Sequence, residues 1–221
     1  MLAFIDAVDK SLPQPGQVFY RHPMPTFTTA ALSPETWPAY AALIEAHHGV
    51  WGGCWCMGFH ALPQGGYASA AASRAAKHAS VVAGTTHAAL VFDGAACVGW
   101  CQYGPAASLP RIKNRKEYER AAAPLPDWRI TCFFVGSTHR HKGVARLALA
   151  GAVAQIAALG GGKVEGYPDD TSTQKISSSF LFNGTLASFE AQGFSRLRPI
   201  GKTRWVVGLE VSPSHGPGPS R

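Results

Sequence analysis

The stretch Arg140-His-Lys-Gly-Val-Ala145 decides the interpretation of the chain, because it joins two apolar runs of different length. The run before it, Arg129 to Val135, is short and rich in β-branched and aromatic residues, which predicts a buried strand. The run after it, Val144 to Leu159, is long and stops at Gly160-Gly-Gly162, which predicts a helix with a glycine end. The basic stretch is therefore a turn from a strand into a helix.

A turn of this kind suits an anion. The first amides of a helix have no partner inside it and carry the positive end of the helix dipole. Gly143 presents no side chain to an approaching ligand and Ala145 only a small one, while Arg140, His141 and Lys142 add donors and charge. A basic loop that merely solubilises a helix start is the alternative, but the flanking strand and helix favour a cofactor pyrophosphate.

The turn resembles the acetyl-CoA turn of the GNAT superfamily of N-acetyltransferases, Gln/Arg-x-x-Gly-x-Gly/Ala; it lacks the patterns of the dinucleotide-binding and P-loop turns. Ile130–Val135, the following helix and Val164-Glu-Gly-Tyr-Pro168 resemble the family's central strand, cofactor helix and next strand. Asn183–Phe194, ending in Gly-Phe, resembles its later helix. The resemblance covers about residues 26–211 and is strongest over 129–194.

The expected fold class is mixed α/β and GNAT-like. Antiparallel strands come first, and an Asp93-Gly94 pair between two apolar runs predicts a hairpin there. A strand–helix–strand crossover with splayed parallel strands follows, and then a C-terminal hairpin over 194–211 near Gly201-Lys202. We expect one domain over 26–211, a proline-containing extension over 1–25 and a disordered tail over 212–221.

The resemblance implies that acetyl-CoA is the co-substrate and that its thioester lies between the splayed strands. Backbone groups of Phe133, Phe134 and Val135 would pair with the pantetheine arm. Asn183 occupies a place where the family often sets a polar residue against the cofactor. The pyrophosphate would be held by the amides of Arg140, His141, Lys142, Gly143, Val144 and Ala145.

The family's usual proton donor to the leaving thiolate is a tyrosine in the later helix, and here that position is Phe189. Phenylalanine cannot donate a proton. Tyr167 is a candidate substitute, with the alternative that it only packs at the rim. Water can also protonate the thiolate, since free thiols have a pKa of about 8.5.

A general base is also expected, because an ammonium must lose a proton before it attacks a thioester. The central strand has no carboxylate. Glu165 lies in the next strand, where alternation could aim it into the splay or at a neighbouring charge, and it is the candidate for a catalytic or substrate-binding role. Glu190 is expected on a solvated helix face.

The loop Trp51-Gly-Gly-Cys-Trp-Cys-Met-Gly-Phe-His60 is unusual in composition. Two cysteines one residue apart, without a second pair, do not have the spacing of a structural zinc site, so no metal is expected. A reactive thiol would need accessible, electropositive surroundings. The remaining alternatives are a packed loop and an acceptor-binding wall, with Cys54 and Trp55 against the substrate and Trp55 in a cation–π contact with an amine.

The formal charge of +7 suits an anionic partner. The basic residues do not form an aromatic-interleaved stripe, so nucleic acid is not expected. Neither a signal peptide nor a membrane-spanning run is recognised, and an odd number of cysteines, five, indicates a reducing, cytoplasmic setting. The basic segment 111–116 alternates with acidic residues, so it is either a solvated face or a site that steers the 3′-phosphate of coenzyme A.

The expected function is an acyl-CoA-dependent N-acetyltransferase in which an amine attacks the thioester directly. A non-catalytic acyl-CoA sensor with the same fold is the alternative, favoured by Phe189 and the missing carboxylate. The acceptor stays open between small molecules and peptides. Terminal strands of this fold often support dimers, which allows a homodimer.

Overall fold

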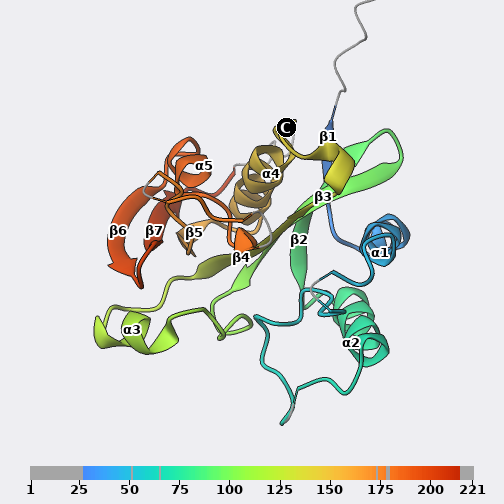
Figure 1. The fold of residues 1–221 in the computed structure, drawn as a ribbon, viewed down its shortest axis with the longest axis horizontal. Helices are drawn as coiled ribbons and strands as arrows, with labels where there is room; N and C mark the ends of the chain where they lie inside the picture. Colours follow the sequence, from blue (N-terminus) through green and yellow to red (C-terminus); the bar gives the residue numbers. More distant parts are fainter. Residues whose placement is uncertain (1–26, 51, 65, 173, 178–179, 215–221) are drawn as a thin grey trace, which may run out of the picture.

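The computed structural model describes residues 27–50, 52–64, 66–172, 174–177 and 180–214 (Figure 1). In chain order, the elements are β1 Thr28–Ala31, α1 Trp37–Glu45, α2 Ala70–Val82, β2 His87–Asp93, β3 Ala96–Pro105, α3 Arg115–Arg120, β4 Trp128–Val135, the 3-10 turn η1 Ser137–His139, α4 Val144–Ala158, β5 Gly162–Gly166, α5 Leu186–Glu190, β6 Ser195–Ile200 and β7 Arg204–Val211. The expected extension over 1–25 lies outside the described residues.

The strands form one mixed sheet in the order β1-β2-β3-β4-β5-β7-β6. Strands β4 and β5 are parallel, and the other neighbours described are antiparallel. The parallel pairing runs from Trp128 opposite Val164 to Ile130 opposite Gly166, after which β4 continues without β5 beside it. This topology confirms the expected fold class, including the splay between the parallel strands.

Both predicted hairpins are present. Gly94 adopts a φ of 58° in the turn between β2 and β3, and Gly201 adopts a φ of 77° in the turn between β6 and β7. These backbone conformations are costly for residues with a side chain, which explains glycine at the two turns.

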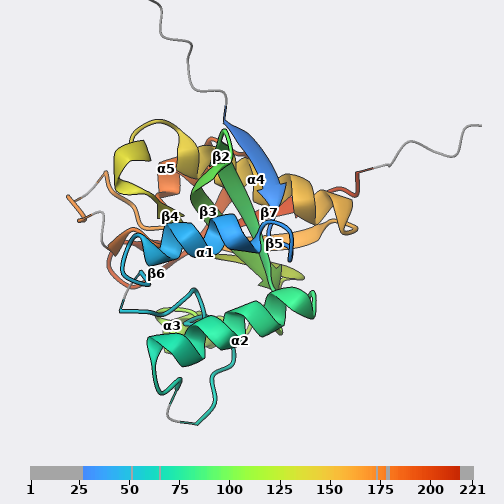
Figure 2. The same cartoon turned by 90° about the vertical axis from the view of Figure 1, so that its right-hand side faces the viewer.

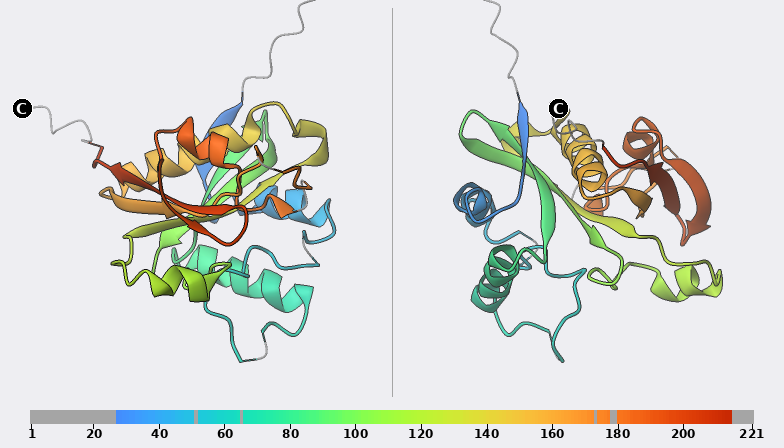
Figure 3. Two further views of the ribbon diagram at one scale, coloured as in Figure 1. Left: turned by 60° about the vertical axis from the view of Figure 1, so that its left-hand side comes forward. Right: turned by 180° about the vertical axis from the view of Figure 1, so that it is seen from behind.

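Helices cover both faces of the sheet. Figures 2 and 3 show α1 and α2 on one face and α4 on the other. Successive residues of each strand alternate between the two layers, so that Phe133 packs in the cluster around α4 and Cys132 in the cluster around α1. Helix α4 matches the predicted helix closely and turns Ala148, Leu149 and Ile156 into the core.

The short helix expected within 180–192 is present as α5, Leu186–Glu190. The residues before α5 run beside the edge of β4. The Phe133 amide donates to the Phe182 carbonyl (2.6 Å), and Asn183 Nδ2 donates to the Thr131 carbonyl (2.6 Å). Gly184, with a φ of 80°, then turns the chain into α5. This segment fills part of the splay between β4 and β5.

Part of the expected tail over 212–221 is described. Residues 212–214 are described, and the Ser214 amide donates to the Ala157 carbonyl at the end of α4 (2.9 Å). Residues 215–221 lie outside the described part. Across the described ranges, no helix combines the length and apolarity needed to cross a bilayer.

Candidate functional site

The turn before α4 has the backbone geometry of an anion site. Gly143 is the N-cap residue, with a φ of 81° and a ψ of 1°. The Leu147 amide donates to the Gly143 carbonyl (3.0 Å) as the first bond of the helix. The amides of Val144, Ala145 and Arg146 precede that bond, so they belong to the helix end that lacks internal partners. A Cβ built on Gly143 meets no protein atom within 4 Å, which leaves space for a ligand.

The loop that leads into this turn is fixed at several points. The Gly136 amide donates to the Val98 carbonyl (2.9 Å). His139 Nε2 lies 3.2 Å from Asp93 in the β2–β3 hairpin. His47 at the end of α1 bonds the Leu43 carbonyl through Nδ1 (2.9 Å) and lies 3.5 Å from the Ser137 amide through Nε2. The turn is therefore held in place before any ligand binds.

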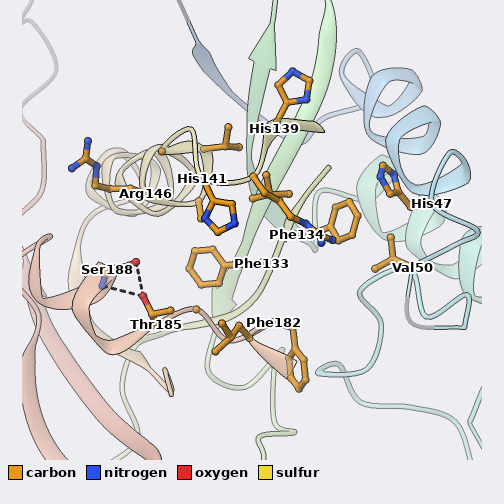
Figure 4. A pocket seen from close by; sticks show the side chains of 17 residues that line it. His47, Val50, Phe133, Phe134, His139, His141, Arg146, Phe182, Thr185 and Ser188 are labelled. Atoms are coloured by element: carbon orange, nitrogen blue, oxygen red, sulfur yellow. Dashed lines mark hydrogen bonds between the residues drawn. The ribbon is translucent and has the colours of Figure 1, made fainter. Parts of the chain in front are cut away.

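A cavity of about 520 Å³ opens at this turn (Figure 4). One side is the turn and the start of α4, the second is the end of β4, and the third is the segment from Leu181 to Ser188, with His47 and Val50 at a fourth side. Figure 4 shows His141, Phe133 and Phe182 arriving in this space from three different segments of the chain. Its volume is within the range of about 300–1,000 Å³ that is typical of ligand sites.

The charges around the cavity favour an anion. Arg140 and Arg146 line it, together with His141, whose backbone takes the left-handed conformation at a φ of 61°. Among the described residues that line the cavity, none is an aspartate or a glutamate. Lys142 is exposed and is not part of the lining, so it contributes charge rather than contact.

The other predicted members of the turn contribute through their backbone. The Val144 side chain is buried in the core and packs near Gly99, so only its amide faces the helix end. Ala145 is half-buried and lines the cavity.

Only part of the backbone of Phe133, Phe134 and Val135 is available to a ligand along the edge of β4. Backbone groups alternate between the two edges of a strand. The Phe133 amide is taken by Phe182, and Phe134 is opposite Trp100 with its backbone towards β3. The N–H and C=O of Val135 face the same edge as those of Phe133, so Val135 and the Phe133 carbonyl are the groups placed for a ligand. All three residues line the cavity.

The side chain of Asn183 contacts β4 and does not line the cavity. Its side chain is buried (2% exposed), and the bond to Thr131 holds the segment across the splay. Its Oδ1 atom has no partner among the described groups. The residue therefore positions the wall of the cavity rather than lining it.

A second cavity, of about 340 Å³, adjoins the first at Phe182, which lines both. Cys54 is half-buried and lines this second cavity. The opposite wall comes from the segment before α3 through Arg111, Ile112 and Lys113. The structure thus places Arg111 and Lys113 away from the turn, which does not support their use for the 3′-phosphate of a cofactor.

Trp55 is buried in the core and does not line the second cavity, although it was expected to contact the acceptor. Its indole is only 3% exposed and stacks on Trp37, with ring centroids 5.8 Å apart. The cation over its ring is Arg74 of α2, at 5.4 Å, and not a ligand. Phe59, four residues later in the same loop, takes the place at the cavity.

Cys56 lies in a buried polar cluster. Its sulfur is 3.1 Å from Cys132 Sγ and 3.1 Å from Trp100 Nε1. Burial acts to raise the pKa of the Cys56 thiol, but the Cys132 hydrogen bond, the nearby Lys77 ammonium and the Trp100 N–H together hold it below its usual value. The surroundings are electropositive, but the thiol is 3% exposed and so inaccessible.

The two candidate catalytic residues occur together, outside both cavities. The hydroxyls of Tyr118 and Tyr167 donate to Glu165 Oε2 at 2.7 Å and 3.0 Å. The Arg129 guanidinium lies over both rings, at 5.4 Å and 5.9 Å. Burial, followed by the charge of Glu165, raises the pKa of Tyr167 well above its usual value. This geometry places Glu165 and Tyr167 in a buried network and gives no contact with the cavities.

Phe189 is also remote from ligand contact. It is fully buried, with its ring edge-to-face against Phe133 (5.8 Å) and Phe194 (4.9 Å). Glycines at 166 and 184 leave room for this ring. Glu190 is exposed and pairs with Arg196 (2.6 Å), in line with the expected solvated face. Within the described ranges, no group of three or more His, Cys, Asp or Glu is arranged to hold a metal ion.

No protein-family model matches the sequence, and no curated protein matches it. In fold, the chain is similar to an acetyltransferase from Thermus thermophilus, at 17% identity over 85% of this chain and 98% of the other, with a TM-score of 0.46. It is similar to an acetyltransferase of the GNAT family from Streptococcus pneumoniae, at 11% identity over 84% and 99%, with a TM-score of 0.45. It is also similar to Arabidopsis thaliana NAA60 in complex with acetyl-CoA, at 10% identity over 84% and 99%, with a TM-score of 0.47.

Several residues of the site have no counterpart in the sequence-based prediction. Arg146 could have been recognised, because it lies in the first helical turn three residues after Gly143. His47 and Phe182 reach the cavities through tertiary folding, and no local pattern indicates them; Phe59 lies in the loop expected as an acceptor wall, but was not singled out within it. Ser188 lines the cavity beside the Thr185 cap, 2.7 Å between hydroxyls (Figure 4).

Proposed function

We propose that this chain is a GNAT-type, acyl-CoA-dependent N-acetyltransferase. The observation that carries the proposal is a cavity in which the open helix start at Gly143 is continuous with the end of β4 at Val135. One end offers amides and cations to a pyrophosphate, and the other offers a strand edge to an amide-containing arm. The second cavity, beyond Phe182, provides a separate approach for an acceptor.

The residues present fit coenzyme A. The amides of Val144, Ala145 and Arg146 would hold the pyrophosphate, with Arg140 and Arg146 neutralising its charge. The backbone of Val135 would pair with the pantetheine arm. Acetyl-CoA supplies an activated acyl group as a thioester, and Phe182 separates its cavity from the acceptor side.

The reaction would proceed by direct transfer. The acceptor nitrogen bonds to the thioester carbon, the carbon–sulfur bond breaks, and an amide and coenzyme A are the products. Water would take the proton from the amine and supply one to the thiolate, because no carboxylate is found among the described residues that line either cavity. A thiol of pKa about 8.5 is a good enough leaving group for this route. The protein then acts mainly by positioning the two substrates.

A screen of amines tests this function. The chain is incubated with acetyl-CoA and a panel of small amines and peptides, while free thiol is measured and products are identified by mass. We expect an acetylated amine formed in equal amount to the thiol. The contrary result is binding of acetyl-CoA with no acetylated product from any amine. That result would support the alternative, an acyl-CoA sensor, which the inert Phe189 favours.

A further inference from the structure

The acceptor-side cavity carries two cations on one wall. Arg111 and Lys113 both line it, one residue apart on the segment before α3. The Arg111 amide donates to the Phe59 carbonyl (3.2 Å), which fixes this segment against the opposite loop. Lys113 Nζ lies over the Phe182 ring, 4.6 Å from its centroid. The backbone of Arg111 and the side chain of Lys113 are thus fixed at the cavity, although both side chains are exposed.

The rest of the lining is apolar. Phe59 and Phe182 pack against each other with ring centroids 6.2 Å apart and line the cavity together, and Ile112 lies between the two cations in sequence. Cys54 and Cys132 complete the surface. Aromatic rings in this arrangement favour a flat or apolar side chain over a polar one.

No carboxylate balances the two cations within the lining that the structure describes. Glu117 and Glu119 of the next helix are engaged elsewhere, with the Gly201 amide (2.8 Å) and Arg115 (2.5 Å). A polyamine or a lysine side chain would therefore meet repulsion here. A ligand with its own carboxylate would be attracted.

We propose that the acceptor is an amino acid with an apolar, aromatic side chain, whose carboxylate binds Arg111 and Lys113. This inference rests on the proposed acetyltransferase function and names its substrate class. The side chain packs against the rings of Phe59 and Phe182, and the α-amine points past Phe182 towards the thioester. Nearby cations also disfavour the ammonium form of the bound amine, which eases its deprotonation where no carboxylate base is present.

The test compares two acceptors that differ in one group. Initial rates are measured at saturating acetyl-CoA with L-phenylalanine and with 2-phenylethylamine, which lacks the carboxylate. An exposed cation contributes about fivefold in affinity, so two cations predict a KM about 25-fold lower for phenylalanine. The variant Lys113→Gln raises the KM for phenylalanine about fivefold and changes that for 2-phenylethylamine by a smaller factor. Lys113→Arg retains the wild-type KM, and so does Lys163→Gln, which removes a cation elsewhere.

Two results would overturn the inference while leaving the acetyltransferase function intact. One is kcat/KM for 2-phenylethylamine equal to or above that for phenylalanine. The other is an increase in the KM for acetyl-CoA, rather than for phenylalanine, in Lys113→Gln. If neither amine is acetylated, calorimetry measures whether phenylalanine binds the complex of the protein with coenzyme A, which distinguishes failure of the amino-acid site from failure of the transfer function. Binding that weakens in Lys113→Gln supports the site although the transfer function fails, and no binding overturns it.

Discussion

The substitution Gly143→Glu tests the anion site most sharply, because it places a carboxylate at the helix start. Gly143 takes a φ of 81° and a built Cβ meets no protein atom within 4 Å. The folded protein thus has space for the new side chain. The cost to folding is confined to the left-handed backbone, about 1–2 kcal/mol.

The cost to ligand binding is larger. At an effective dielectric constant of about 20, a carboxylate about 4 Å from one phosphate charge is repelled by about 4 kcal/mol. This corresponds to a dissociation constant for coenzyme A about 1,000-fold weaker. Gly143→Gln has nearly the same size without the charge, so the difference between the two variants reports the electrostatic part. That difference should shrink as salt concentration rises.

Isothermal titration calorimetry with coenzyme A measures these affinities. The control is Gly84→Glu, at a glycine with a φ of 67° and equally open surroundings, remote from the turn. It carries the same charge change and a similar backbone cost, and we expect wild-type affinity. Equal affinity for Gly143→Glu and Gly84→Glu would refute the assignment of the turn to the pyrophosphate.

Three further predictions concern stability. Burial lowers the pKa of His60 to about 3, below its usual 6.5. The stability that the neutral imidazole contributes is therefore fully present above pH 6.5 and is lost as the pH falls towards 3. In urea denaturation, the free energy of unfolding of the wild-type protein should fall by up to about 1.4 kcal/mol per pH unit between pH 7 and pH 5, and His60→Asn should lack this fall. Gly166→Ala puts a methyl group into the Phe189 ring and should lower the free energy of unfolding by about 1–3 kcal/mol. Glu165→Ala leaves the Tyr118 and Tyr167 hydroxyls without their acceptor and should cost about 3 kcal/mol, with the loss in stability rather than in kcat/KM.

Each of these has an outcome that would count against it. The same pH dependence in wild type and His60→Asn would show that this imidazole titrates normally; His87, whose pKa burial also lowers, remains in both proteins. Gly58→Ala, where a Cβ meets nothing within 4 Å, should leave the free energy of unfolding unchanged, and a loss equal to that of Gly166→Ala would contradict the packing argument. A Glu165→Ala protein of normal stability but greatly reduced kcat/KM would return the residue to the catalytic role expected from sequence.

The parts of the fold set by local pattern could be predicted from the sequence. The turn at Gly143 and the stop at Gly160 depend on glycine conformations and on helix ends, which neighbouring residues determine. The hairpin at Gly94 is of the same kind. These signals place the open start of α4, and the resemblance to the GNAT family supplied the expectation of a splay beside it.

The second cavity, the proposed acceptor site, could not be predicted in the same way. Trp55 and Phe59 belong to one loop, and only packing against Trp37 decides which of them is buried. Glu165 could face either way on its strand, and the hydroxyls of Tyr118 and Tyr167 determine its surroundings. Such choices depend on side chains that are distant in sequence, which periodicity does not report.

The most direct test of the proposed site is a crystal structure of the chain with coenzyme A bound. We predict the pyrophosphate within hydrogen-bond distance of the Val144, Ala145 and Arg146 amides, and the pantetheine arm paired with the Val135 backbone. The sulfur should end beside Phe182. Coenzyme A bound elsewhere, or with its pyrophosphate away from the Gly143 turn, would contradict the account.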